Sequence, residues 1–267
     1  MTFEADLMQT TDQNKIQVMG ILNVTPDSFY KESRQVTEEA VAARAGQILA
    51  EGGDMIDIGA CSTRPGAQPV SEAEEIRRLD VALETVRRLY PDARLSVDTF
   101  REEVANRCIR KWGVAMINDI SGGDEAMFRL AAMSGAGYVL THNDPTGRSN
   151  TPEEVAAWLA ARLQRLRISG VGEVWLDPGF GFNKTLEENW TLLHGLEKIT
   201  ALGAPVLVGV SRKSMIYKLL DTTPDGALNG TTVANTLALT KGAHILRVHD
   251  VREAVETIRI MDAMAGS

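Results

Sequence analysis

Eight short apolar runs recur along the 267-residue chain, and longer amphipathic stretches separate them. Each run has the length of a strand, and several are rich in Val, Ile and Leu, as buried parallel strands are. Strands that alternate with helices over this length predict a single-domain α/β fold, a (β/α)8 TIM barrel, with a doubly wound open sheet as the alternative. The runs are residues 17–23, 55–59, 94–98, 114–119, 138–142, 174–177, 205–210 and 244–249.

The stretches between the runs carry helix signals. Apolar residues in 41–49 recur at the spacing of one helical face. Thr151, followed by a proline and then by Glu154, predicts a capping box at a helix start, and Ser71 with Glu74 predicts another. The arginine pairs at 77–78 and 87–88 follow Glu74 and Glu84 at helical spacing, so we expect a solvated face of ion pairs there.

Composition excludes several classes of protein. The net charge of −8 makes nucleic acid a poor partner. No apolar run is long enough to span a membrane, and no secretory signal opens the sequence, so we expect a cytoplasmic protein without a membrane partner. Two distant cysteines, Cys61 and Cys108, fit neither a disulfide framework nor a zinc site. Residues 1–14 are polar and unpatterned and predict a flexible extension before a barrel domain at 15–267.

Polar residues stand where nearly every apolar run ends. In a β/α barrel the carboxyl ends of all strands face one mouth, where active sites form. Each such residue could merely cap the next helix, but eight in succession favour a site. Side chains alternate along a strand, so Arg247 and His249 can both point into the mouth. We read His142, which has no second histidine at metal-ligand spacing, as structural.

The chemistry of these strand ends suggests two subsites. Asp98, Asn118, Asp177 and Lys213 offer carboxylates, an amide and an ammonium group, which suit a flat heterocycle with both donors and acceptors. A cationic group suits phosphate or pyrophosphate, and its members are Arg64, Arg212, Arg247 and His249. Asn23 supplies an oxygen that could bind Mg²⁺, an ion that usually also takes substrate phosphate oxygens.

Seven motifs in order make the chain resemble the dihydropteroate synthases, from residue 17 to about 260. They are MGILNVTPDSF at 19–29, DIGACSTRPG at 57–66, SVDT at 96–99, INDI at 117–120, DPGFGF at 177–182, SRKS at 211–214 and RVHDV at 247–251. The resemblance implies a TIM barrel and a transferase of folate biosynthesis. Such an enzyme joins 6-hydroxymethyl-7,8-dihydropterin pyrophosphate to p-aminobenzoate, giving 7,8-dihydropteroate and pyrophosphate.

The resemblance also implies roles for individual residues. Pterin would be bound by Asp98, Asn118, Asp177 and Lys213. Pyrophosphate would be bound by Asn23, Arg64, Arg247 and His249, with Mg²⁺ on Asn23. p-Aminobenzoate would be bound by Thr63, Arg64, Pro65, Phe182, Lys213 and Ser214. The catalytic set would be Asp98, Lys213, Arg247, His249 and Arg64, assisting pyrophosphate departure before the neutral amine attacks. Sulfonamides as ligands and a homodimer are further expectations from the family.

Some positions depart from the family pattern. Lys31 stands where the family usually has an aspartate in the first loop, spanning residues 30–34 here, Thr141 replaces a methionine, and Asn183 replaces a glycine. A pterin-binding methyltransferase domain is the main alternative, but it needs no p-aminobenzoate site. A metal-dependent hydrolase of the same fold would show a His-x-His pair after the first strand, and none is present. A non-catalytic pterin-binding protein would be expected to lose Lys213, Arg247 or His249.

Overall fold

The computed structural model describes residues 15–25, 37–61, 70–147 and 150–265. Its eight strands are parallel and follow the order β6-β5-β4-β3-β2-β1-β8-β7. An isolated bridge between Leu176 of β6 and Val206, just before β7, brings the two ends of this sheet together into a nearly closed barrel. The strands are β1 Gln17–Asn23, β2 Met55–Gly59, β3 Leu95–Asp98, β4 Met116–Asp119, β5 Gly137–Thr141, β6 Val174–Asp177, β7 Leu207–Val208 and β8 Ile245–Val248.

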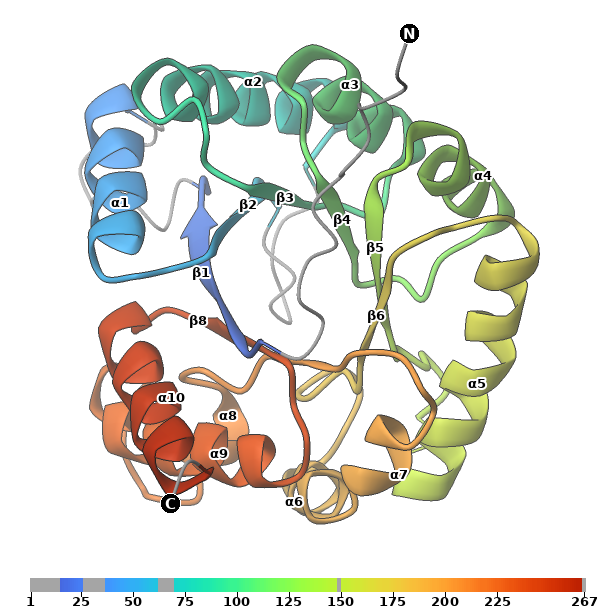
Figure 1. Cartoon of the computed structure of the whole chain (residues 1–267), viewed down its shortest axis with the longest axis vertical. Coiled ribbons are helices and arrows are strands. Elements are labelled where there is room, and N and C mark those ends of the chain that lie inside the picture. The colour runs from blue at the N-terminus through green and yellow to red at the C-terminus, as the bar shows by residue number, and fades with distance from the viewer. Residues whose placement is uncertain (1–14, 26–36, 62–69, 148–149, 266–267) are drawn as a thin grey trace, which may run out of the picture.

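Helices follow the strands and form a ring around them (Figure 1). This arrangement confirms the predicted TIM barrel and rules out the open doubly wound sheet. The helices are α1 Glu38–Ala50, α2 Glu72–Leu89, α3 Glu102–Trp112, α4 Glu125–Ser134, α5 Pro152–Ile168, α6 Leu186–His194, α7 Glu197–Thr200, α8 Ser214–Tyr217, α9 Leu228–Thr240 and α10 Val251–Ala265, with a 3-10 turn at Asp225–Ala227. No helix within the described ranges is long and apolar enough to cross a membrane.

Local sequence explains where several elements begin. The capping box at Thr151 and Glu154 forms as predicted, with Pro152 in the first turn of α5. The second predicted box is only half formed. Ser71 accepts from the backbone of Glu74, but the Glu74 carboxylate binds Arg77 and Arg78 instead of returning to the cap. The two arginines lie one helical turn after Glu74, and their ion pairs with its carboxylate replace the hydrogen bond that would complete the capping box.

Two other expectations need correction. The run at 205–210 yields only a two-residue strand, Leu207–Val208; Pro205 has no N–H to donate to a ladder. The arginine pair at 87–88 does not pair with Glu84. Arg87 instead donates to four backbone carbonyls, two in the turn after α2 and two at the end of α3, and Arg88 bonds Glu38 of α1.

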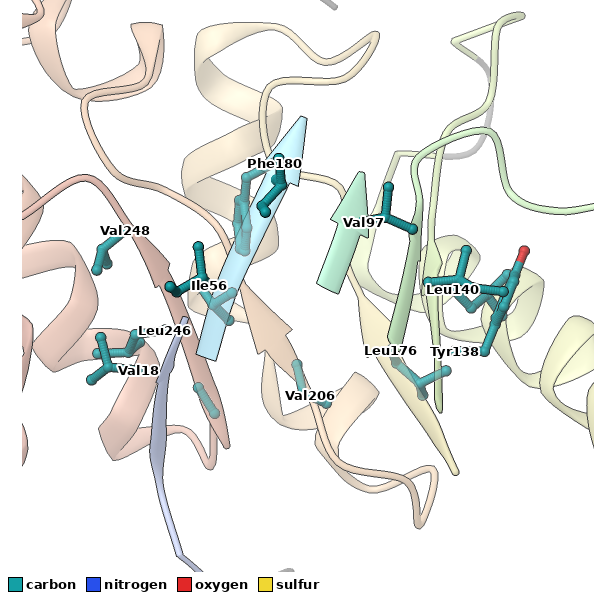
Figure 2. Close-up of a cluster of buried hydrophobic side chains, with 14 of the residues drawn as sticks. Val18, Ile56, Val97, Tyr138, Leu140, Leu176, Phe180, Val206, Leu246 and Val248 are labelled. Atoms are coloured by element: carbon teal, nitrogen blue, oxygen red, sulfur yellow. The ribbon is translucent and has the colours of Figure 1, made fainter. Parts of the chain in front are cut away.

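The alternation of side chains along each strand divides the apolar core into two shells. The outer shell lies between strands and helices and includes Val18, Ile56, Val97 and Leu246 (Figure 2). The inner shell fills the barrel near the amino ends of the strands, and its members are Met19, Met55, Met116, Val139, Trp175, Leu207 and Ile245. Because this inner plug closes one end of the barrel, polar side chains farther along the same strands can gather only at the carboxyl-terminal mouth.

Candidate active site

A buried polar network crosses the mouth of the barrel and joins four strands. Arg247 of β8 donates from Nε to Asp57 Oδ2 of β2 at 2.7 Å and from Nη2 to Asp98 Oδ2 of β3 at 2.8 Å. Asn118 of β4 donates from Nδ2 to the same Asp57 oxygen at 3.0 Å. The structure therefore brings three predicted residues, Asp98, Asn118 and Arg247, into one cluster.

Asp57, the pivot of this network, was not predicted as a site residue. Its side chain is fully buried, and it lies on the same face of β2 as Met55, which points into the barrel. A buried carboxylate needs a paired charge, and Arg247 supplies it. The signal was present in the sequence, because an acidic residue at an inward position of an otherwise apolar run is hard to explain by packing.

Burial and pairing act against each other on these charges. Burial raises the pKa of Asp98 above its ordinary value, and the attraction of Arg247 opposes this rise. Burial also works against the charge of Arg247, but Asp57 and Asp98 outweigh it and raise the arginine's pKa, so the guanidinium stays charged. The cluster thus holds a permanent cation between two carboxylates at the base of the mouth.

Asp177 and Lys213 form a second group on the opposite strands. Asp177 ends β6 and accepts from the backbone N–H of Gly179 at 2.7 Å. The Lys213 ammonium donates to the Phe180 carbonyl and lies 4.7 Å from the centroid of the Phe182 ring. Burial lowers the pKa of Lys213 to about 8, with Asp177 opposing, and burial raises the pKa of Asp177, with Lys213 opposing.

Ser214 is the first residue of α8, directly after Lys213, so it lies at the same edge of the barrel as the ammonium group. An ammonium group beside an aromatic ring and a serine suits a flat aromatic ligand that carries an anion.

Several buried polar atoms of the strands that form the mouth find no hydrogen-bond partner in the described ranges. They are Asp57 Oδ1, Ser96 Oγ, Asn118 Oδ1 and Thr141 Oγ1, each on the inward face of its strand. A buried polar atom without a partner is costly, so such atoms are informative where they cluster. A heterocycle with both N–H groups and ring acceptors could satisfy them, as the predicted pterin subsite requires.

Asn23 ends β1 and shares its surroundings with Asp98. A Cβ atom built on Gly59, between them, would lie 3.6 Å from Asn23 Oδ1 and 3.5 Å from Asp98 Oδ2. Amide and carboxylate oxygens are the donors that Mg²⁺ takes, so the residues fit the ion. No group of three or more His, Cys, Asp or Glu in the described part could hold a metal alone, so Mg²⁺ here would need substrate oxygens and water as further ligands.

His249 lies just beyond β8, on the wall of a cavity of about 390 Å³. The cavity is lined largely by residues at the end of α1 and the start of α10, among them Arg44, Glu51 and Glu253, and by none of the mouth residues described above. Its backbone is anchored, because its N–H donates to Ser211 Oγ at 3.1 Å and its carbonyl accepts from Arg44 at 2.6 Å. Burial lowers the pKa of His249 to about 4, and the nearby arginines act in the same direction. Arg212, a member of the predicted cationic group, is paired with Asp250 at 2.7 Å.

Three predicted site residues, Thr63, Arg64 and Pro65, lie outside the described residues, as do the altered first loop at 30–34 and the expected extension at 1–14. The other two departures from the family pattern, Asn183 and Thr141, lie within the described residues. Asn183 has a φ of 47°, a left-handed conformation that asparagine tolerates better than most residues. Thr141 is buried at the end of β5, facing the mouth.

Comparisons with known proteins agree with this geometry. A family model described as pterin binding enzyme matches residues 19–249. A dihydropteroate synthase of Streptococcus pyogenes is 37% identical over 254 residues, covering 92% of this chain and 95% of the relative. A solved dihydropteroate synthase of Xanthomonas albilineans with 4-aminobenzoic acid superposes with a TM-score of 0.89 at 35% identity, covering 96% of this chain and 95% of that one. A second solved dihydropteroate synthase, from Thermus thermophilus in complex with 6HMPPP, has a TM-score of 0.82 at 40% identity. The match covers 95% of this chain and 96% of that one.

Proposed function

The chain belongs to the dihydropteroate synthases, transferases of the pterin-binding enzyme family, and on this premise we propose which of its residues perform each part of the reaction. The observation that carries the proposal is the convergence of Asp98, Asn118, Asp177 and Lys213 at one mouth of the barrel. These are the four side chains that the sequence predicts for pterin binding.

The pterin ring binds between the two polar groups of the mouth. Asp177 accepts from ring N–H groups, and Lys213 donates to ring acceptors. Asn118 contributes its amide oxygen, which is buried and has no bond from another described side chain. Asp98 lies where positive charge develops on the pterin as pyrophosphate leaves, and a preorganised carboxylate stabilises such charge.

The pyrophosphate binds at the cationic side of the mouth. Arg247 is held rigidly by Asp57 and Asp98, so its charge is in place before the reaction begins. His249, two residues beyond Arg247, and Arg64 are assigned to the pyrophosphate by family resemblance. Mg²⁺, held by Asn23 and by substrate oxygens, would supply further positive charge to the departing group.

p-Aminobenzoate binds against the ring of Phe182, with Lys213 and Ser214 beside it and Thr63, Arg64 and Pro65 assigned by resemblance. Its aniline nitrogen is neutral at pH 7. It attacks the electron-poor pterin methylene carbon once the bond to pyrophosphate has broken, and it releases a proton after the new N–C bond forms. The protein's task is to align the two reactants and stabilise charge, so no covalent intermediate with a protein nucleophile is needed.

Pyrophosphate release by the purified protein tests this function. With Mg²⁺ and dihydropterin pyrophosphate, release should depend on p-aminobenzoate, and dihydropteroate should form in equal amount. Asp177→Ala should abolish pterin binding, whereas Asp262→Ala, an exposed change on α10, should leave it intact. Saturable pterin binding without coupled product would instead indicate a methyltransferase-like or non-catalytic protein, and unchanged pterin affinity in Asp177→Ala would show that the pocket is misplaced.

We also propose two kinds of partner and a location. Sulfonamides share the aniline ring of p-aminobenzoate and would compete for the Phe182 side of the mouth.

A homodimer is expected from the family. The α8–α9 region offers a surface for it, because it carries four exposed apolar side chains: Leu219, Leu220, Val233 and Leu237. Two free cysteines suit the reducing cytoplasm. Sedimentation of the protein at several concentrations would test the dimer.

A further inference from the structure

We propose that Lys184 is a positioning residue for pterin binding, because its buried ammonium group ties the turn after β6 to the end of β5 and so holds the Asp177 carboxylate in place. The inference rests on the proposed placement of the pterin at Asp177. Lys184 lies seven residues beyond that carboxylate, in the turn that leads to α6.

The ammonium group is surrounded by acceptors from two separate segments. It donates to the carbonyl of Gly179 at 2.9 Å and to that of Phe182 at 3.3 Å, both in its own turn. It also lies 3.0 Å from Nδ1 of His142, the residue that follows β5, 42 positions earlier in the chain. One side chain therefore connects two neighbouring strand ends at the mouth of the barrel.

These contacts close a ring of hydrogen bonds that contains Asp177. The backbone N–H of His142 donates to the Asp177 carbonyl at 2.8 Å. The Asp177 side chain accepts from the Gly179 N–H at 2.7 Å, and the Gly179 carbonyl accepts from Lys184. Lys184 then returns to His142. The carboxylate is thus oriented by Gly179, and Gly179 is in turn held by the ammonium group.

The protonation state of His142 agrees with this ring. Burial lowers the pKa of His142 to about 4, and the charge of Lys184 acts in the same direction. The imidazole is therefore neutral at physiological pH, and its Nδ1 can accept a hydrogen bond from the ammonium group. The ring plane is fixed by an edge-on contact with Trp158 at a centroid distance of 4.9 Å.

Lys184 also supports the p-aminobenzoate side of the mouth. The Phe182 carbonyl that it holds belongs to the residue whose ring lies near Lys213, and Lys213 donates to Phe180 in the same turn. The ammonium group is therefore placed to fix both the pterin carboxylate and the aromatic wall.

Starting α6 does not require this charge. The helix has its own capping box, Thr185 with Glu188. Asn189 binds the carbonyls of Lys184 and Thr185 and accepts from the Gly181 N–H at 2.6 Å. Burying an ammonium group is costly, so a residue needed only for packing here could be apolar. The charge is better explained by what it does to Asp177.

Lys184 also helps to keep Asp177 ionised. The charged groups that face this carboxylate are Lys213 from the loop after β7, Arg247 from β8 and Lys184 itself, and all three oppose the effect of burial on the Asp177 pKa. Removal of one of three cations should raise the pKa of Asp177. Pterin binding would then be lost at a higher pH as the solution is made acidic, an effect that a purely structural role would not produce.

The test compares Lys184→Met, Lys184→Gln and the control Lys198→Met, an exposed lysine of α7. The dissociation constant of dihydropterin pyrophosphate is measured directly, and kcat and KM are measured with p-aminobenzoate saturating. Loss of hydrogen bonds from a charged donor should raise the dissociation constant and KM by about tenfold in Lys184→Met. Lys184→Gln, which keeps an N–H donor, should give intermediate values of both constants. In both Lys184 variants kcat should change far less than KM, and the control Lys198→Met should match the wild type.

The pH profile completes the experiment. The acid limb of pterin affinity should move upward by about 0.5 pH unit or more in Lys184→Met and stay in place in Lys198→Met. Unchanged pterin affinity in a folded Lys184→Met protein would overturn the inference, as would an unmoved acid limb. If Lys184→Met does not fold, Lys184→Gln carries the test. If Asp177→Ala also binds pterin normally, the pterin site itself is wrong, which separates the two failures.

Discussion

At the scale of single residues, the site depends on charges that are buried and therefore must be paired. Asp98 and Arg247 were identified from their places at strand ends, and the structure joins them directly. It also binds Arg247 to Asp57, which was not identified from the sequence. A lone acidic residue in a strand does not reveal its partner. Only the register of the barrel brings positions 57 and 247 together.

Arg247→Ala should impair both stability and function. It leaves two buried carboxylates, Asp57 and Asp98, without their cation, and breaking a buried pair typically costs about 3–5 kcal/mol. Urea denaturation measures that loss, and calorimetry with pyrophosphate and Mg²⁺ measures the weaker anion binding. Arg77→Ala, which removes an exposed ion pair of α2, should change neither quantity appreciably. Unchanged pyrophosphate affinity in Arg247→Ala would remove Arg247 from the anion site.

Gly179→Ala should weaken pterin binding and lower the free energy of unfolding by about 3 kcal/mol. Gly179 has a φ of 72°, and an added Cβ would lie 1.9 Å from the His142 carbonyl oxygen, so the turn that carries Asp177 must shift. Gly170→Ala is the matched control, with a φ of 87° and no atom within 4 Å of the added Cβ. It should show only the cost of positive φ, about 1 kcal/mol. Equal effects of the two changes on pterin affinity would contradict the steric argument.

At the scale of elements, helix starts are encoded locally and the sequence predicts them well. The capping box of α5 formed as expected, whereas that of α2 lost its glutamate to Arg77 and Arg78. The geometry of an N-cap depends on three or four consecutive residues. The carboxylate of a capping box can nevertheless pair with a longer side chain one turn away, and it then no longer binds the cap. The Arg87 contacts show the same limit, since two of the acceptors, the carbonyls of Trp112 and Gly113 at the end of α3, come near Arg87 only in the folded chain.

Thr151→Ala should destabilise the protein by about 1 kcal/mol because the first turn of α5 loses its N-cap. Chemical denaturation gives the difference in free energy of unfolding. The rate of dihydropteroate formation at 25 °C should not change, because the start of this helix carries no proposed site residue. Thr191→Ala, an exposed change within α6, should be neutral or slightly stabilising, since alanine has the higher helix propensity. A neutral Thr151→Ala would mean that the cap contributes nothing net.

At the scale of the whole molecule, the barrel converts the sequence order of eight strands into one shared mouth. Apolar side chains fill the amino-terminal half of its interior, and polar side chains of the same strands are collected at the other end. Burying titratable groups in this way makes stability depend on pH. His142 shows the effect clearly because it is fully buried and its pKa lies well below the ordinary value.

Stability should fall as the pH drops from 7 toward 4, in part because of His142. Its pKa of about 4 in the folded protein is below the ordinary 6.5, so the unfolded chain binds more protons in this interval, and above pH 7 the effect vanishes. Comparison with His142→Asn, whose side chain can still accept from Lys184, isolates the contribution from those of buried carboxylates. Relative to this variant, the wild type should lose about 1–2 kcal/mol between pH 7 and pH 5. A pH-independent difference would show that His142 titrates normally.

The sequence alone determined the eight apolar runs, the order of strands and helices, the polar strand ends that face one mouth, and the resemblance to the family. These follow from short-range spacing and from motifs that are contiguous in the chain. The tertiary structure alone decided which polar groups meet: Arg247 with Asp57, 190 residues apart, and Lys184 with His142, 42 residues apart. Such pairs depend on strand register and on how deeply each charge is buried, and neither can be predicted from the residues that neighbour the charge in the sequence. A buried charge is stable only beside its partner, so the fold assigns the partners and completes the site.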